Sequence, residues 1–234
     1  MKKKHFFSLV LLMSLSLCMV SCSNGNNDEP EINEPENNEP GAAVGPVAVD
    51  LGLSVKWASC NVGATLPEEY GGYFSWGETE EKDFYGWSAY KLCNGTINTL
   101  TKYCYDEMEG NVDNKMVLEP IDDVANVVMG EGWRMPTDAE IMELVEGCTW
   151  EWTVLNDVNG YRVTGTNGNS IFLPAAGYIS GKEVEYPGVY GMYWSSTIGD
   201  LFTYHGCCLE FTSQYFVNMV TYRNGGQTVR AVFE

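Results

Sequence analysis

The chain has 234 residues, and its 32 acidic side chains outnumber its 13 Lys and Arg side chains, which gives a formal net charge of −19. So negative a chain repels nucleic acid and anionic lipid head groups, which argues against both as partners. After a short leader is set aside, the length suits one domain with a sizeable core.

The first residues have the pattern of a secretory signal. Residues 2–4 are lysines, an apolar run covers residues 6–20, and Ser21 and Cys22 end the run. A basic start, a short apolar stretch and a small residue before the break are typical of a cleaved signal. About 15 apolar-biased residues are too few to cross about 30 Å of hydrocarbon, so we expect no membrane span here.

Residues 19–22, MVSC, resemble a lipobox, which implies that Cys22 is lipidated and begins the mature chain. Cys18 is the competing site, but Leu17 before it is too bulky for the position next to the cut. Two or more acyl chains, at about 0.8 kcal/mol per buried CH₂, would make this anchoring effectively permanent. The alternative is a plain signal peptide with a chance cysteine at position 22.

The acidic, Asn-rich run after Cys22 resembles the export tag of Bacteroidetes surface lipoproteins, which implies an outer-membrane protein that faces the exterior. Residues 23–46 hold four prolines and no Lys or Arg, so they cannot bury enough apolar surface to fold. We predict a disordered acidic tether, spanning roughly 25–30 Å if coil-like. The predicted organisation is therefore a signal over 1–21, a lipidated tether over 22–46 and one domain over 47–234.

The predicted elements of the domain begin with a strand or hairpin over residues 47–60, where apolar and polar residues alternate. Residues 73–77 (YFSWG) predict a short strand that ends at a glycine. Residues 78–119 are irregular and polar, and we expect long loops whose packing anchors are the aromatic residues Trp87, Tyr90, Tyr103 and Tyr105. Residues 120–128 are predicted to form a helix, because acidic residues stand at the start of this segment.

The clearest helical signal covers residues 138–147. Thr137 is the expected N-cap, and Glu140 three residues later completes a capping box. Ile141, Leu144, Val145 and Cys148 recur at helical spacing and predict one buried face. After this helix the chain returns to short strands.

Residues 150–154, 161–164 and 170–173 predict a three-stranded meander, with turns at Asn159-Gly160 and Asn167-Gly168. Four closing strands are expected after the meander, and Asn224-Gly225 fits a tight turn before the last one. These strands cover residues 190–196, 209–212, 217–222 and 228–233.

Six cysteines lie in the domain, and an exported location permits disulfides among them. Six cysteines allow 15 complete pairings, and the sequence does not choose among these. Cys93 and Cys104 are the simplest pair to join, while free buried thiols are an equal alternative. The remaining four are Cys60, Cys148, Cys207 and Cys208.

Four motifs occur together in a fixed order: GWRMPTDAE over 132–140, SIFLPAAGY over 170–178, YWSST over 193–197 and VRAV over 229–232. They resemble a bacterial group of the C-type lectin superfamily, close to the formylglycine-generating-enzyme fold and the Fibrobacter major paralogous domain. Residues 49–63 and 73–79 resemble the version carried by Bacteroidetes lipoproteins. The resemblance covers nearly all of the domain. It implies an α+β, C-type-lectin-like fold in which small twisted antiparallel sheets lie beside one or two helices, under long loops.

The region 197–228 resembles the variable region of proteins diversified by retroelements, where fixed anchors alternate with changeable positions. The matching positions are the run 197–200, then Leu209, Phe211, Val217, Met219, Arg223 and the run 226–230. The resemblance implies a ligand-binding face on the 197–206 loop and the outward residues of 214–224. Strand alternation places Val217 and Met219 inward, and Asn218, Val220 and Tyr222 outward. The candidate ligand-binding residues are Leu201, Phe202, Tyr204, His205, Tyr215, Phe216, Asn218, Val220, Tyr222 and Asn224.

The sequence supports a catalytic function less well than a binding function. The formylglycine-generating relatives are oxidases with a C-terminal cysteine pair, but Cys207 and Cys208 are adjacent and do not match that spacing. His205 beside them makes a poor zinc site, since no partner histidine remains in the domain. Neighbouring loop acids such as Glu78, Glu80 and Glu81, or Asp122 and Asp123, show no sign of a paired acid and base.

The sequence also lacks the calcium-ligand triplets of sugar-binding lectins. We therefore expect a non-catalytic surface protein without a cofactor or metal, whose partner is an extracellular protein or glycan. A structural role in a surface or fimbrial assembly is the alternative, and a copper or cysteine oxidase is a remote one. In the assembly role, the proposed ligand-binding face would be buried against another protein. In the oxidase role, Cys207 and Cys208 would be reactive.

Overall fold

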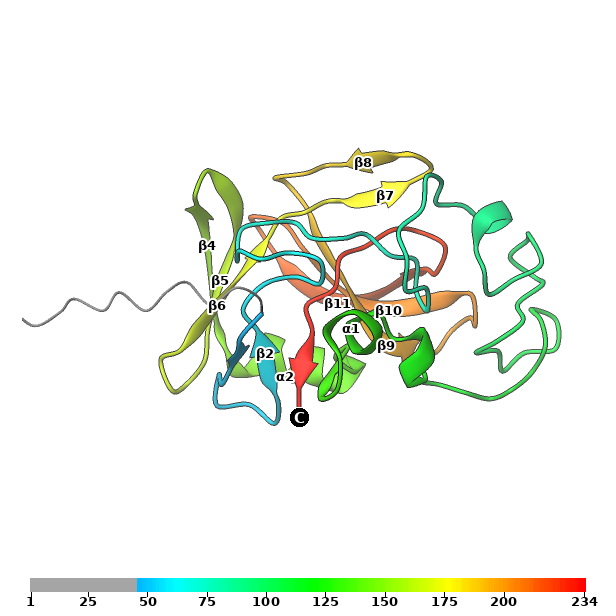
Figure 1. Cartoon of the computed structure of the whole chain (residues 1–234), viewed down its shortest axis with the longest axis horizontal. Helices are drawn as coiled ribbons and strands as arrows, with labels where there is room; N and C mark the ends of the chain where they lie inside the picture. The colour runs from blue at the N-terminus through cyan, green and yellow to red at the C-terminus, as the bar shows by residue number, and fades with distance from the viewer. Residues whose placement is uncertain (1–45) are drawn as a thin grey trace, which may run out of the picture. The chain divides into compact units, whose positions relative to one another are not determined.

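A computed structural model describes residues 46–234 (Figure 1). The predictions about the signal, the lipidation of Cys22 and most of the tether fall on residues 1–45, outside the described residues. Within 46–234, small antiparallel sheets are joined by long loops and few helices. This content agrees with the expected α+β class and is equally compatible with a mainly β one.

The two ends of the described chain meet in one sheet, with the strand order β1-β2-β12-β3. Its strands are β1 (Ala48–Val49), β2 (Lys56–Ala58), β12 (Val232–Phe233) and β3 (Trp133–Arg134). The pairing of β1 with β2 confirms the opening hairpin. The strand expected over 228–233 was too long, because the chain before Val232 runs through the core and buries Arg230 among backbone carbonyls.

A three-stranded sheet, β11-β10-β9, lies at the centre of the domain. It consists of β9 (Gly191–Ile198), β10 (His205–Phe211) and β11 (Phe216–Tyr222). β9 and β11 lie close to their predicted ranges, whereas β10 begins at His205 instead of at residue 209 and so includes the end of the expected 197–206 loop. Both faces of this sheet are covered. One face packs on a core that includes Trp76 and Trp194, and the other packs on a core that includes Leu144 and Phe211.

Helix α2 (Asp138–Gly147) confirms the strongest helical prediction. The Thr137 hydroxyl accepts from the Glu140 N–H, and the Glu140 carboxylate accepts from the Thr137 N–H, so the capping box is complete. Ile141 and Leu144 are buried against the central sheet, as their spacing predicts, while Val145 and Cys148 are half-buried.

The helix expected over 120–128 is two elements: η2 (Pro120–Asp122), a 3₁₀ turn, and α1 (Val124–Met129). Asp123 separates them because its carboxylate caps α1. It accepts from the N–H groups of Ala125 and Asn126, and its other oxygen accepts from the Met135 N–H. An N-cap requires an extended backbone, which ends the preceding turn.

The meander is confirmed as β4 (Thr149–Leu155), β5 (Val158–Thr164) and β6 (Ser170–Pro174). The turn between β4 and β5 was misplaced by sequence. It lies at Asn156 and Asp157, which have φ of 46° and 66°. Gly160 is inside β5, where a Cβ would lie 2.3 Å from the Leu173 carbonyl oxygen, so this glycine permits close strand approach.

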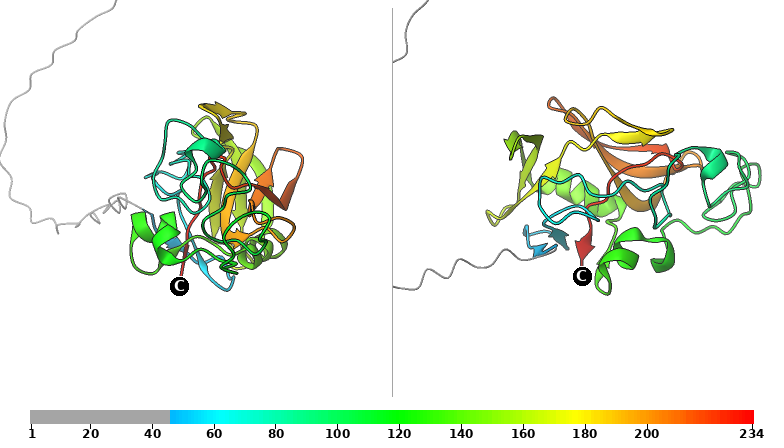
Figure 2. Two further views of the ribbon diagram at one scale, coloured as in Figure 1. Left: turned by 90° about the vertical axis from the view of Figure 1, so that its right-hand side faces the viewer. Right: turned by 45° about the horizontal axis from the view of Figure 1, so that its top comes forward.

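The sequence did not predict the hairpin of β7 (Tyr178–Ser180) and β8 (Glu183–Glu185). Figures 1 and 2 show this hairpin, in yellow, on the same side of the domain as the central sheet and separate from the meander. A single bridge joins Gly177 to Gly191 of β9, and another joins Ile179 to Gly226. The hairpin therefore stands next to the central sheet without extending it.

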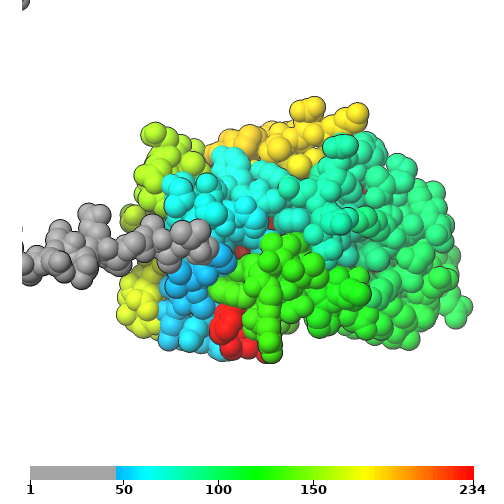
Figure 3. All heavy atoms as spheres, viewed as in Figure 1, coloured from blue at the N-terminus to red at the C-terminus, as the bar shows by residue number. Residues whose placement is uncertain are grey.

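Residues 59–118 form the long irregular part of the domain and cover much of one face, in cyan to green in Figure 3. The strand expected over 73–77 is only a bridge between Phe74 and Gln227. Of the expected anchors, Tyr90 and Tyr103 are buried, whereas Trp87 and Tyr105 are partly buried; η1 (Trp87–Ala89) is a 3₁₀ turn. These loops lack regular secondary structure, and the packing of large buried aromatic side chains stabilises them instead.

The six cysteines of the domain are all free thiols in the structure. Cys93 and Cys104 lie in one small apolar cluster, where each thiol donates to a backbone carbonyl, of Trp87 and Asp106 respectively. The Cys93–Cys104 disulfide, the simplest pairing by sequence, is therefore not formed, and the alternative of free buried thiols describes this structure.

Candidate functional site

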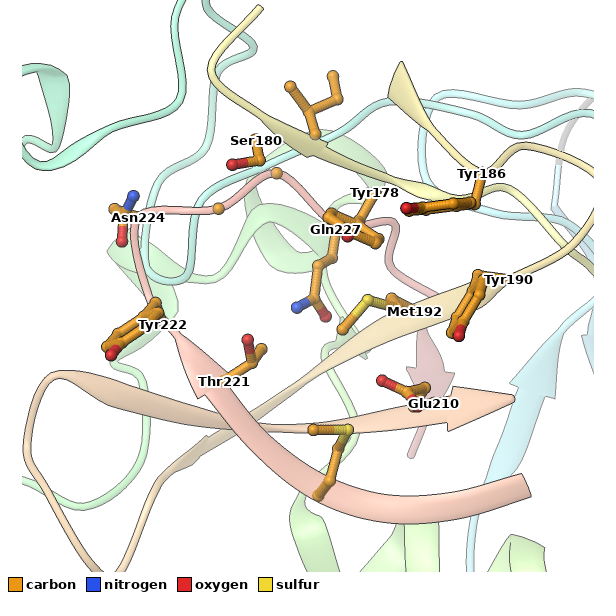
Figure 4. Close-up of a pocket in the computed structure, with 14 residues that line it drawn as sticks. Tyr178, Ser180, Tyr186, Tyr190, Met192, Glu210, Thr221, Tyr222, Asn224 and Gln227 are labelled. Carbon is orange, nitrogen blue, oxygen red and sulfur yellow. The ribbon is translucent and has the colours of Figure 1, made fainter. Parts of the chain in front are cut away.

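A cavity of about 480 Å³ lies between the β7–β8 hairpin and the central sheet (Figure 4). Its size is within the range of small-molecule sites. Its walls come from the hairpin, the segment after it, one face of β9 to β11, and the turn after β11. The side chains that line it include Tyr178, Tyr186, Tyr190, Met192, Glu210, Met219, Tyr222, Asn224 and Gln227.

Two backbone hydrogen bonds join the β7–β8 hairpin to the turn after β11 at the edge of the cavity. The Ile179 N–H donates to the Gly226 carbonyl at 2.7 Å, and the Gly226 N–H donates to the Ile179 carbonyl at 2.9 Å. Gly177 turns the chain at a φ of 72°, and a Cβ there would lie 2.2 Å from the Glu185 carbonyl oxygen. Only glycine permits this turn, so the hairpin position depends on it.

Tyrosine rings form one wall of the cavity. The ring centroids of Tyr178 and Tyr186 are 6.1 Å apart, and those of Tyr186 and Tyr190 are 5.4 Å apart. Tyr186 is 54% exposed, so its ring is open to a ligand from solution. Rigid aromatic rings give large contact area at low cost in conformational entropy.

A carboxylate lies next to this wall. Glu210 of β10 accepts a hydrogen bond of 2.6 Å from the Tyr215 hydroxyl. This bond is the first reason that the pKa of Tyr215 lies above its ordinary value. In Figure 4 Glu210 lies just below Met192 and Tyr190, on the same side of the cavity.

Two amide side chains reach the cavity with unused acceptors. Gln227 is only 3% exposed, and its Oε1 accepts no hydrogen bond from any group of residues 46–234. The Oδ1 of Asn224 is likewise buried and without a donor among those residues. Figure 4 shows the Gln227 amide pointing into the middle of the cavity.

An aromatic cluster adjoins the cavity at the end of the central sheet. We define it as Trp87, Phe202, Tyr204, His205 and Tyr222. The rings of Phe202 and Tyr204 stack at 5.0 Å, and His205 lies 4.9 Å from Tyr222. Tyr222 also contacts Trp87 at 6.3 Å and lines the cavity, so it joins the two regions.

A buried threonine fixes the loop that carries this cluster. Thr203 is fully buried, and both its N–H and its hydroxyl donate to the Glu109 carboxylate, at 2.7 and 2.6 Å. Its neighbour Phe202 is 44% exposed, and Leu201 is 70% exposed. Burial lowers the pKa of His205 below its ordinary value, which favours the uncharged form of the ring.

The structure brings together only part of the predicted ligand face. Leu201, Phe202, Tyr204, His205 and Tyr222 gather at one end of the sheet, and Tyr222 and Asn224 line the cavity. Tyr215 and Phe216 lie at the other end, at the β10–β11 turn. The Phe216 ring stacks on Trp150 at 4.6 Å and belongs to the core.

The predicted alternation of β11 was wrong in two places. Val217, expected inward, is 43% exposed, and Asn218, expected outward, donates to the Asp138 carboxylate of α2 at 2.7 Å. Val220 is half-buried opposite Cys207. The reason is that α2 packs against one face of this edge strand and the apolar core packs against the other face. Neither face of β11 is therefore fully exposed to solvent.

Sequence reasoning missed the cavity residues Tyr178, Tyr186, Tyr190 and Gln227, and treated the segment around Glu210 only as an anchor. The available signal was three tyrosines within residues 178–190, separated by Gly181 and Gly188. That pattern indicates an aromatic-rich turn, but it does not show which other segment faces it.

The two adjacent cysteines lie in different surroundings. The Cys207 thiol donates to the Ile198 carbonyl at 3.3 Å, and burial raises its pKa to about 12. Cys208 is fully buried in the core beside Trp194, and burial raises its pKa further. A thiol held protonated in this way is a poor nucleophile and a poor metal ligand.

The acids considered as a catalytic pair are used in structural contacts. Glu78 is buried and forms an ion pair of 2.7 Å with Lys82. Asp122 pairs with Lys102, and Asp123 caps α1. Within 46–234, no group of three or more His, Cys, Asp or Glu residues is placed to hold a metal ion.

None of the helices in residues 46–234 has the length and apolar character needed to span a membrane. Comparison of the whole chain with protein-family models, with curated proteins and with solved structures found no match.

Proposed function

We propose that this protein is a non-catalytic lipoprotein, anchored in the outer membrane through Cys22, that faces the exterior and binds an extracellular ligand. The basic start, the short apolar run and the lipobox-like MVSC support the anchoring. The observation that carries the binding role is the aromatic cluster joined to a 480 Å³ cavity through Tyr222.

Exposed aromatic residues gathered on one rigid surface are typical of binding sites. Tyr222 is 53% exposed and Phe202 is 44% exposed, although each contacts other rings. Because the rings support one another and Thr203 holds the loop, little freedom is lost when a ligand binds. A protein or a glycan of the surroundings is the class of partner that such a surface suits.

We also propose that residues 47–234 have a C-type-lectin-like fold. The motifs that carry the resemblance lie together: β3 from 132–140 and β12 from the VRAV run pair with each other, and the YWSST run forms part of β9. A small central sheet, one main helix and long loops over one face agree with the fold that the resemblance implies.

The surroundings of the candidate reactive groups support the proposal that the protein is non-catalytic. Cys207 and Cys208 are buried thiols with raised pKa values, and the candidate acids are held in ion pairs or as a helix cap. An oxidase role would require a reactive thiolate, so we expect Cys207→Ser and Cys208→Ser to leave ligand binding unchanged.

Surface display and ligand binding can be tested together on intact cells that carry the full chain. We expect wild-type cells to capture ligands from an array of extracellular glycans and purified extracellular proteins. Tyr222→Ala and Phe202→Ala should lower the capture at least about tenfold, since central aromatic residues dominate binding energy. Cys22→Ser should remove the protein from the membrane fraction.

The matched control is Val154→Ala, because Val154 is 56% exposed on β4, outside the cavity and the cluster. It should bind like the wild type. If no array component is captured and the purified full chain forms polymers, the protein is instead a structural part of a surface assembly.

We further propose that a retroelement diversifies the region 197–224. The support is the order of anchors in the sequence and the exposure of Leu201, Phe202 and Tyr222 between them. Sequencing this locus and its flanks across many isolates should show substitutions concentrated in 197–224, beside a near-copy template and a reverse transcriptase gene. Evenly spread variation without a template would end this proposal and leave the binding role in place.

A further inference from the structure

The cavity offers hydrogen-bond acceptors that nothing in the described chain uses. Gln227 is 3% exposed, and its buried Oε1 has no donor within 46–234. Asn224 is only partly buried as a residue, but its Oδ1 is also buried and without a donor among those residues. A buried acceptor without a donor lowers stability. A ligand that brings N–H donors into the cavity would recover this loss.

The charge of the cavity is negative. Glu210 is the only charged side chain that lines it, and no Lys, Arg or His is present in its walls. None of the ion pairs formed within 46–234 includes Glu210. One carboxylate oxygen accepts from the Tyr215 hydroxyl, which leaves the negative charge without a cationic partner. An anionic ligand is therefore disfavoured, and a cationic one is attracted.

The aromatic wall has the same preference. The faces of Tyr178, Tyr186 and Tyr190 carry the negative lobes of the ring quadrupoles, and cations are attracted to such faces within about 6 Å. The centroids of neighbouring rings are 5.4 and 6.1 Å apart, so one ligand group can contact more than one ring. Figure 4 shows Tyr186 and Tyr190 on the same side of the cavity as Glu210, with Gln227 at its centre.

We propose that this cavity binds a protonated amine. Its ammonium group would lie against the tyrosine wall and donate to the Glu210 carboxylate and to Gln227 Oε1. A primary ammonium has three N–H donors and one positive charge, which satisfies both the unused acceptors and the unpaired carboxylate. A neutral sugar would satisfy the acceptors and leave the charge unpaired. The inference rests on the proposed binding role and names the ligand chemistry of that same surface.

The amine could belong to a small molecule or to a lysine side chain of a partner protein. Calorimetric titration of the full chain separates these sources with four probes: butylammonium, glucosamine, a lysine-containing tripeptide with blocked ends, and the same tripeptide with its lysine acetylated. We expect the three amines to bind and the acetylated peptide to bind at least about tenfold more weakly. Tighter binding of the lysine tripeptide indicates a protein partner, and equal or tighter binding of the two small amines indicates a small molecule.

Glu210→Gln should weaken the amines at least about tenfold, and added salt should weaken the wild type in the same direction. Glu183→Gln is the matched control, because Glu183 is exposed on β8 and does not line the cavity. It removes one negative charge from the β7–β8 hairpin, on the other side of the cavity from β10, and should leave binding unchanged. Tyr186→Ala, at an exposed loop position, tests the wall even if Glu210→Gln proves unstable.

Binding of glucose as tight as that of glucosamine, with no effect of Glu210→Gln, would overturn the proposal in favour of a neutral glycan. If no amine binds while intact cells still capture an array ligand through Tyr222, this inference fails and the proposed binding role stands. If the cells capture nothing either, both fail together.

Discussion

Replacing Arg230 with methionine is expected to lower the free energy of unfolding by about 3–5 kcal/mol. Arg230 is 1% exposed, and none of the ion pairs formed within residues 46–234 includes it. Its guanidinium donates to Asn61 Oδ1 at 2.9 Å, to the Ala58 carbonyl at 2.9 Å and to the Phe172 carbonyl at 2.8 Å. Methionine fills much of the volume but leaves all three buried acceptors without donors.

Guanidinium chloride unfolding of the full chain, followed by tryptophan fluorescence, measures this loss. Arg162→Met is the matched control, because Arg162 is half-exposed and forms one ion pair of 3.3 Å with Glu151. It should change the unfolding free energy by less than about 0.5 kcal/mol. Equal midpoints for Arg230→Met and the wild type would show that these hydrogen bonds do not stabilise the fold.

Replacing Arg223 with methionine is expected to loosen the long loops and to raise the rate of tryptic cleavage within residues 86–118 at least about tenfold. Arg223 is fully buried. It donates to the Tyr90 hydroxyl at 2.9 Å and to the carbonyls of Tyr103 and Thr203 at 2.9 and 2.8 Å. One side chain thus holds the end of β11, the long loops and the loop of the aromatic cluster.

The guanidinium of Arg223 also lies 4.7 Å from the centre of the Trp76 ring, and methionine loses this cation–π contact. Timed trypsin digestion of the full chain, with mass spectrometry of the fragments, locates the first cut. We expect it after Lys91, Lys102 or Lys115, all within the loosened segment. Arg223→Lys, which keeps the charge but not the forked geometry, should fall between methionine and the wild type. Unchanged cleavage in Arg223→Met would mean that the loops are held by other contacts.

The burial of Arg223 and Arg230 could not be predicted from the sequence. Both stand at positions that the resemblances mark as fixed, yet charged residues are ordinarily expected on the surface. The structure supplies the reason: the Arg223 guanidinium donates to backbone carbonyls of the long loops, and the Arg230 guanidinium donates to backbone carbonyls of strands β2 and β6. No periodic pattern in the sequence contains this information, because the acceptors lie more than 100 residues away for Tyr103 and Ala58.

The candidate site was predicted in part for the same reason. The 197–206 loop and Tyr222 were identified from exposed aromatic positions between apolar anchors, and they do form one cluster. Phe216 was misjudged because its neighbour across the fold, Trp150, lies on the distant strand β4. The cavity was not predicted because its two sides, the β7–β8 hairpin and the central sheet, are brought together by a tertiary contact. That contact joins Ile179 to Gly226, which lie far apart in the chain.

The sequence by itself determined the features that depend on neighbouring residues. The capping box of α2, the three strands of the meander and the cores of β9 and β11 follow from local patterns and were predicted within a few residues. Tertiary structure alone decided the pairing of β3 with β12, the place of the β7–β8 hairpin and the burial of two arginines. Those features depend on hydrogen bonds and packing between segments far apart in the chain, and such contacts leave no periodic signal in either segment.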